Sequence, residues 1–384
     1  MRSGSPRRDA VKLIALLGAG IATFASNQSI GVTLPVHVVT QMGGTTADVG
    51  LVAAAGTVGV LIGRVASGPM VERTGPVSLG AVSLALVAGT CLGYLLVPDD
   101  IAGLAMVRAV HGVVFAWATT ALLVAMTTAV RSMSRQRSIA LANLAMPISL
   151  AVFPVVAIEI FDASLSTVAA VAVVLGLLGA ACYLLVRAPG TPAVPPTTSA
   201  PPVARRLPML LLITAALLGA ADGAALDYLP VLGVTREIEG YGWAFTVFAV
   251  GTTFTLGLIT VIRRVIPGAR LVAIGGIVTA AALATWPWVD ALAPLMVGVT
   301  AYGIGFAVAQ TGLTSLAVEW SPAQQGKALA GILLAFDIGR GAGVYLIGLL
   351  IASSGFVSAL VPLALLLAVA SIASGRRRER GSVL

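Results

Sequence analysis

The stretch LLGAGIATFASNQSIGVTLPV, which is Leu16–Val36, has a counterpart half a chain later in LLITAALLGAADGAALDYLPV, Leu211–Val231. Each is apolar over about 20 residues, the length that an α-helix needs to cross the hydrocarbon core of a bilayer, and each ends in Leu-Pro-Val. When the two tripeptides are aligned, Asn27 lies opposite Asp222, so each stretch carries a polar side chain at the same depth. Such a pair is typical of a duplicated membrane transporter.

The composition places the whole chain in a membrane. Of its 384 residues, 58% are hydrophobic and only 10% are charged, and the mean hydropathy is +1.01, which a soluble domain with a hydrated surface does not reach. We therefore expect an all-α integral membrane protein with about twelve transmembrane helices. The expected spans are 12–34, 49–71, 76–97, 101–130, 138–160, 164–186, 207–230, 241–262, 271–289, 291–318, 326–353 and 356–374.

The chain divides at a proline-rich stretch. Between Ala188 and Arg206 it contains six prolines among small and polar residues, and sequence of this kind forms an extended, semi-rigid spacer instead of a helix. We predict a first six-helix bundle at 1–187, a cytoplasmic linker at 188–206, a second six-helix bundle at 207–375 and a basic cytoplasmic tail at 376–384.

The distribution of positive charge predicts the orientation. Lys and Arg are retained on the cytoplasmic side during insertion, and the basic clusters fall on one side of a twelve-span topology. This places both termini in the cytoplasm and the chain in the cell (inner) membrane as a multi-pass protein. The basic pI near 10.2 is explained by these short loops, so no nucleic-acid partner is expected. The clusters contain Arg2, Arg7, Arg8 and Lys12; Arg131, Arg135 and Arg137; Arg187, Arg205 and Arg206; Arg263, Arg264 and Arg270; and Arg376, Arg377, Arg378 and Arg380.

Three segments resemble one transporter family. The connection after the second span, Gly68–Gly75, reads GPMVERTG, similar to the G-x-L-A-D-R-x-G signature of the major facilitator superfamily. Arg108–Gly112 in the fourth span resembles the R-x-x-x-G element of that family, and Ser321–Ala328 resembles its P-x-x-x-G-x-A loop. The G-P-x-x-G motif that many drug–proton antiporters of the family carry in the fifth span is absent from Asn143–Ser149. The resemblance covers essentially the full chain.

The resemblance implies a fold and a gating loop. The family fold has two pseudo-symmetric six-helix bundles, with spans one, four, seven and ten around a central cavity. In the loop, Glu72 would bridge to the start of span eleven, where free N–H groups and the helix dipole favour a carboxylate; a solvated turn is the alternative. Opening toward the inner side would break that contact and leave Arg73 and either Arg131 or Arg135 as exchange partners. Gly68 and Gly75 would serve close packing and the turn. The residues expected to face the cavity are Asn27, Gln28, Arg108, His111, Asp222, Tyr302 and Gln310.

Charges inside the membrane are the strongest site candidates because they are costly to bury in lipid. The expected interior charges are Arg108, Arg340, Asp222 and Asp337. We expect Asp222 to bind a proton or a cationic substrate group, since its protonation can change with its surroundings; a permanent structural pair with Arg108 or Arg340 is the alternative. Asp337 and Arg340 are three residues apart on one helix and can pair with each other. His111 is expected either to carry a proton or to pack in the interior.

The expected function is secondary active transport by alternating access, most simply proton-coupled export of a small organic compound such as a drug or metabolite. Import or facilitated diffusion of a small metabolite is an alternative, and a non-transporting membrane scaffold or sensor is a second. No phosphate-binding signature for ATP occurs, and neither a metal-ligand cluster nor a nucleophile–base set is apparent, so we expect no enzyme, cofactor or metal. The expected partners are the small-molecule substrate, protons and the lipid bilayer, and the expected state is a monomer.

Overall fold

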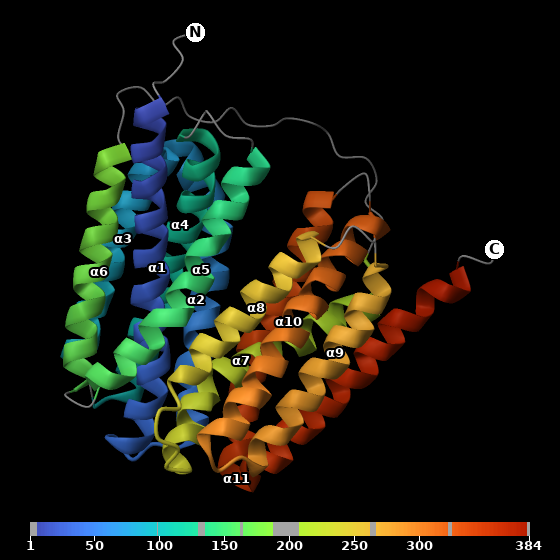
Figure 1. Cartoon of the computed structure of the whole chain (residues 1–384). Helices are drawn as coiled ribbons and strands as arrows, with labels where there is room; N and C mark the ends of the chain where they lie inside the picture. Colours follow the sequence, from blue (N-terminus) through green and yellow to red (C-terminus); the bar gives the residue numbers. More distant parts are fainter. Residues whose placement is uncertain are drawn as a thin grey trace. The chain divides into compact units, whose positions relative to one another are not determined.

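The computed structural model describes residues 6–97, 99–129, 135–161, 164–186, 207–261, 266–321 and 325–381. Over these ranges the regular structure is helical throughout (Figure 1). The elements are α1 (Pro6–Thr40), α2 (Thr46–Thr74), α3 (Pro76–Leu96), α4 (Ile101–Ala129), α5 (Arg135–Phe161), α6 (Leu165–Val186), α7 (Met209–Thr235), α8 (Trp243–Val261), α9 (Gly268–Thr285), the 3-10 turn η1 (Trp286–Trp288), α10 (Leu292–Trp320) and α11 (Gln325–Gly381).

The helices account for the expected spans. Within the described ranges, ten helices are long and apolar enough to cross a membrane, and α8 contains a shorter apolar stretch, Trp243–Ile259. Helix α11 holds two of the expected spans, because its backbone leaves the helical conformation at Gly355 (φ 81°, ψ 174°), where a residue with a side chain is strained. The twelve expected segments therefore correspond to α1–α10 and the two arms of α11, which confirms the predicted number.

Local sequence sets where several helices begin. Gly75 has a φ of 79° and is followed by Pro76 at the first position of α3, where the missing N–H of proline is tolerated. The carboxylate of Asp100 accepts hydrogen bonds from the backbone N–H groups of Ala102 (3.1 Å) and Gly103 (3.0 Å) at the start of α4. Such caps satisfy donors that the first turn of a helix leaves free.

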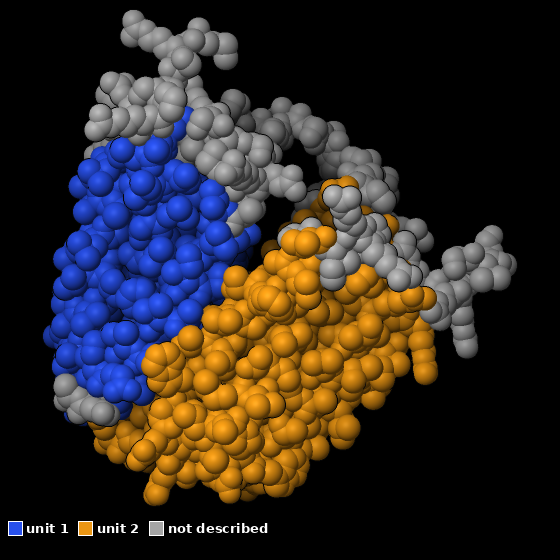
Figure 2. Space-filling view, in the orientation of Figure 1, with its two compact units in different colours: residues 1–34, 55–198 blue, residues 35–54, 199–384 orange. Residues whose placement is uncertain are grey.

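The chain forms two compact units (Figure 2). Unit 1 comprises residues 1–34 and 55–198, and unit 2 comprises residues 35–54 and 199–384. The end of α1 and the start of α2 therefore belong to unit 2 although they precede most of unit 1 in the sequence. The predicted linker at 188–206 lies outside the described residues.

Glycines bring helices of unit 1 close together. A Cβ atom on Gly59 of α2 would collide with the carbonyl oxygen of Ala109 on α4, and one on Gly112 of α4 would collide with the carbonyl oxygen of Gly56 on α2. Small residues at such crossings let the two backbones approach closely, which is the usual way that membrane helices associate. Helices α2 and α4 are thereby held with their backbones in contact.

Close contacts at glycines also join α7 and α11 in unit 2. Gly219 and Gly223 are four residues apart on α7, and Gly339 and Gly343 have the same spacing on α11. A Cβ on Gly219 would collide with the carbonyl oxygen of Phe336, and a Cβ on Gly339 with that of Ala216. The glycines that follow Asp337 therefore bring α11 into close contact with α7.

Segment 35–54 packs on this α7–α11 pair. The hydroxyl of Tyr228 donates to the carbonyl oxygen of Val344 at 2.6 Å and lies 3.3 Å from the carbonyl oxygen of Thr46. The Thr46 hydroxyl donates to the carbonyl oxygen of Gly348 at 3.0 Å. The start of α2 is thus hydrogen-bonded to α11 within unit 2.

Candidate functional site

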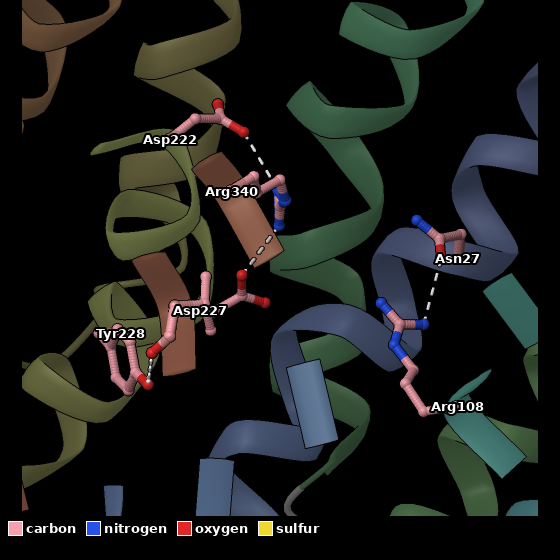
Figure 3. Close-up of polar contacts among 7 residues, drawn as sticks. Asn27, Arg108, Asp222, Asp227, Tyr228 and Arg340 are labelled. Atoms are coloured by element: carbon pink, nitrogen blue, oxygen red, sulfur yellow. Dashed lines mark hydrogen bonds and ion pairs between the residues drawn. The ribbon is translucent and has the colours of Figure 1, made fainter. Parts of the chain in front are cut away.

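Unit 2 contains an arginine held by two aspartates. Nη1 of Arg340 on α11 lies 3.1 Å from Oδ2 of Asp222, and Nη2 lies 2.8 Å from Oδ2 of Asp227. Both aspartates belong to α7, and they lie on either side of the guanidinium (Figure 3). Their side chains are only 9% and 8% exposed, whereas that of Arg340 is 24% exposed. We call Asp222, Asp227 and Arg340 the unit 2 triad.

The glycine contacts explain why Arg340 reaches α7. A Cβ atom at Gly223 would lie 3.2 Å from Cγ of Arg340, so the arginine stem occupies space that a larger residue would fill. Asp222 precedes this glycine directly, and Asp227 follows it by about one helical turn. The guanidinium therefore passes over Gly223 and ends between the two carboxylates.

The unit 2 triad has an excess of negative charge. Two carboxylates face one guanidinium, and Asp337 lies close enough to act electrostatically on both Asp222 and Arg340. A buried charge is tolerated in a membrane protein when it is paired or when it serves an ion or proton pathway. One arginine neutralises only one of these acids, so the cluster has the capacity to take up a proton or a cationic group.

Unit 1 contains an arginine with a neutral partner. Nη1 of Arg108 on α4 donates to Oδ1 of Asn27 on α1 at 3.1 Å (Figure 3). The described part of the chain provides Arg108 with no carboxylate within ion-pair distance. The cation is therefore oriented by an amide but not neutralised by it.

His111 lies one turn after Arg108 and is fully buried. Neither of its ring nitrogens has a hydrogen-bond partner among the described residues, and its ring packs 6.0 Å from that of Tyr94, centroid to centroid. This is the environment of an interior packing residue. The role of His111 as a proton carrier stays a prediction.

The remaining cavity candidates differ in their surroundings. Tyr302 is fully buried, and its ring packs against those of Phe248, Trp286 and Phe306. Gln28 on α1 and Gln310 on α10 are partly buried. Tyr302 thus belongs to an aromatic cluster of unit 2, and the cavity-facing role of all three residues stays a prediction.

The predicted gating residues lie at the end of α2 and near the start of α5. Gly75 has the positive φ expected of the turn, whereas Gly68 is exposed and a Cβ there would meet no atom within 4 Å. Glu72 and Arg73 are exposed. Arg131 and the side chain of Arg135 lie outside what the structure describes, so the gating exchange remains a prediction.

Asp227 is not among the site residues expected from the sequence. The expected interior acids of the second half are Asp222 and Asp337, whereas the ion pairs of Arg340 described above are with Asp222 and Asp227. The available signal was an acid within the apolar stretch of the seventh span, since any such residue is a candidate in a membrane helix. The pairing of Asp222 with Arg340 is the structural alternative that the sequence left open.

The apolar helices of the described ranges are those of a multi-pass membrane protein. Residues 16–241 match the sequence model of the Major Facilitator Superfamily, which is more than half of the chain. The chain therefore belongs to the Major Facilitator Superfamily. No curated protein matches it significantly.

Solved transporters share the fold over nearly the whole chain. The nucleoside transporter NupG is 13% identical with a TM-score of 0.74, covering 95% of this chain and 97% of its own. A bacterial homologue of the human lysosomal transporter Spinster, inward-facing and unoccupied, is 13% identical with a TM-score of 0.75, covering 97% and 98%. A POT family transporter in complex with a thioalcohol-conjugated peptide is 11% identical with a TM-score of 0.76, covering 94% of each chain. These likenesses confirm the all-α fold with two six-helix bundles.

Proposed function

We propose that this chain is a proton-coupled secondary transporter that exports a small organic compound by alternating access. The observation that carries the proposal is the unit 2 triad, in which Arg340 is bound by Asp222 at 3.1 Å and by Asp227 at 2.8 Å. Asp222 and Asp227 are the proposed coupling carboxylates. Asp337, which acts electrostatically on the same arginine, is a proposed auxiliary acid.

Two carboxylates on one arginine suit reversible proton binding. When both acids are ionised, one negative charge of the triad is uncompensated. Protonation of either acid removes that excess and leaves Arg340 paired with the other, so no buried charge loses its only partner. In a single ion pair, protonation would leave the arginine unpaired, which is strongly unfavourable in the interior. The triad can therefore take up one proton without breaking apart.

The triad also lies where a change in charge can be transmitted. Arg340 belongs to α11 and both acids to α7, and Tyr228, the residue after Asp227, donates to Val344 of α11. A proton that weakens one contact of Arg340 changes how tightly α11 is held to α7. In an alternating-access transporter, the proton exerts its effect by favouring one of the two packings.

The proposed substrate is a small polar organic molecule, which accords with the nucleoside transporter and the peptide-bound transporter among the chains of the same fold. Export is the proposed direction of its movement. Import of a metabolite is the alternative that the following experiment separates from export.

The first test measures the accumulation of antibiotics, dyes and metabolites in an efflux-deficient bacterium expressing the chain, with and without a protonophore. Lower accumulation that the protonophore reverses supports proton-driven export. Raised accumulation of a compound would indicate that the chain imports it instead of exporting it. An unchanged result for every compound would favour the non-transporting scaffold.

The second test removes the coupling carboxylates. Asp222→Asn and Asp227→Asn are expected to abolish gradient-driven transport at unchanged expression, because each leaves a triad without excess negative charge. Asp290→Asn is the matched control, since Asp290 is exposed in the connection before α10. Full gradient-driven transport by both triad variants would overturn the coupling assignment.

A further inference from the structure

We infer that Arg108 is an anion-recognition site and that the transported solute carries a carboxylate, alone or as the acidic group of a zwitterion. That the solute is transported rests on the proposed function. The anion-binding site itself rests on residues of unit 1 alone. Its starting point is the hydrogen bond from Nη1 of Arg108 to Oδ1 of Asn27, at 3.1 Å.

The charge of Arg108 is not compensated within the described residues. Its hydrogen-bond partner is the amide of Asn27. The imidazole of His111 and the phenol of Tyr94 lie near enough to interact electrostatically with it, and neither group supplies a carboxylate. Charged side chains inside membrane helices pair with one another, face a water-filled cavity or mark a substrate pathway. A partly buried guanidinium without a carboxylate is therefore a candidate to receive an anion from outside the chain.

The arginine is held in place by small residues. A Cβ atom on Gly56 of α2 would lie 2.9 Å from Cγ and 3.0 Å from Nε of Arg108, and one on Gly31 of α1 would lie 3.5 Å from Nη2. The side chain thus occupies the space that these glycines leave open on two helices. Such a fixed guanidinium binds an oxyanion with less loss of conformational freedom than a free one.

Donors remain for an anion. A guanidinium has five N–H groups, and the contact with Asn27 uses one of them. Two parallel N–H donors match the two oxygens of a carboxylate, and such bidentate, charge-assisted pairs are among the strongest hydrogen bonds in proteins. A carboxylate is therefore the group that this side chain recognises best.

The repeat shows what Asn27 does. In the alignment on Leu-Pro-Val, Asn27 corresponds to Asp222, and each of these residues binds the arginine of its own unit. The aspartate neutralises Arg340, whereas the asparagine orients Arg108 and leaves its charge in place. Asparagine and aspartate have nearly the same shape, so the difference between the two positions is one of charge.

The test measures binding to the purified full chain in detergent, without any gradient. Three matched probe pairs are used: benzoate and benzamide, nicotinate and nicotinamide, and phenylalanine and phenylalaninamide. Binding is measured as a concentration-dependent rise in the thermal unfolding temperature. We expect at least one carboxylate to stabilise the parent chain and its amide not to do so. Stabilisation by no carboxylate, or equal stabilisation by acid and amide in every pair, would overturn the inference.

Variants assign the binding to Arg108. Arg108→Gln and the near-isosteric Asn27→Asp are each expected to weaken carboxylate binding at least 10-fold, the first by removing the cation and the second by neutralising it. Arg108→Lys should retain weaker binding because it keeps the charge but loses the bidentate fork. Arg270→Gln, at an exposed arginine, is the matched control. Unchanged affinity in a folded Asn27→Asp or Arg108→Lys protein would contradict the assignment.

The outcomes separate this inference from the proposed function. Binding at equilibrium requires no proton gradient, so loss of gradient-driven transport with intact carboxylate binding would count against the coupling proposal alone. Gradient-driven transport of compounds without any acidic group, together with no carboxylate binding, would overturn the anion site and leave the coupling proposal standing.

Discussion

Arg108 in unit 1 and Arg340 in unit 2 are partly buried arginines of the described residues, and their partners differ in charge. Arg340 is bound by two carboxylates on α7, whereas Arg108 is bound by the amide of Asn27 on α1. Both side chains pass over a glycine of a neighbouring helix, Gly223 in unit 2 and Gly56 in unit 1. The two units therefore hold an arginine by similar packing and differ in the charge that faces it.

This difference shows that packing and neutralisation are separate properties of a buried charge. The glycines leave the space that the guanidinium occupies, and the side chains that contact it, two carboxylates in unit 2 and one amide in unit 1, determine whether its charge is compensated. Unit 2 combines a compensated arginine with an excess acid, which suits proton binding, while unit 1 leaves a cation available.

Removal of the cation from the triad should have the largest effect on stability. Arg340→Gln leaves Asp222 and Asp227 buried without their counter-charge, and breaking a buried pair in this way typically destabilises a protein by about 3–5 kcal/mol. Thermal unfolding of the purified variant should shift strongly downward at neutral pH. Combining it with Asp222→Asn and Asp227→Asn should restore part of the loss, and a single variant as stable as the parent would contradict the structural role of the triad.

Adding a side chain at the close crossing of α7 and α11 should have the next largest effect on stability. A methyl group at Gly339 would collide with the carbonyl oxygen of Ala216, so Gly339→Ala should destabilise unit 2 by about 1–3 kcal/mol through overpacking. The measurement is the thermal unfolding temperature, with Gly68→Ala as the control because a Cβ at Gly68 meets no atom within 4 Å. Equal stability of the two variants would show that the close crossing is not required.

Removal of one acid should affect stability much less than removal of the arginine. Asp227→Asn keeps the ion pair of Arg340 with Asp222 and removes the excess negative charge, so we expect a loss of about 1.5 kcal/mol, the lower end of the range for a hydrogen bond to a charged group. Proton-driven transport should nevertheless be lost. A loss of stability as large as that of Arg340→Gln would mean that the two acids are not interchangeable partners.

Removal of the unit 1 cation should have the smallest effect on folding. Arg108→Gln deletes one hydrogen bond to an amide but also deletes an uncompensated charge, and we expect the two changes to offset each other within about 1 kcal/mol. The contrast with Arg340→Gln is measured by thermal unfolding under identical conditions. A drop as large as that of Arg340→Gln would indicate that Arg108 has a structural partner comparable to the triad.

Local sequence predicted the helices well because span length and helix starts depend on neighbouring residues. Gly75 and Pro76 marked the start of α3, and the interruption expected between 353 and 356 coincides with Gly355 inside α11. Asp222 and Arg340 were expected as interior charges from the scarcity of charge in apolar spans. Asp227 was overlooked, because nothing in its immediate sequence shows that it faces α11.

The sequence by itself determined that this chain is a duplicated membrane protein with about twelve helices and a polar residue at matching depths of its two halves. Apolar length, proline and glycine positions and repeated tripeptides are local properties, so they can be read without coordinates. Only the tertiary structure decided that Arg340 joins Asp222 to Asp227 and that Arg108 is bound to Asn27. These pairings connect residues 81 to 118 positions apart, and they depend on which helix faces the glycines allow to meet.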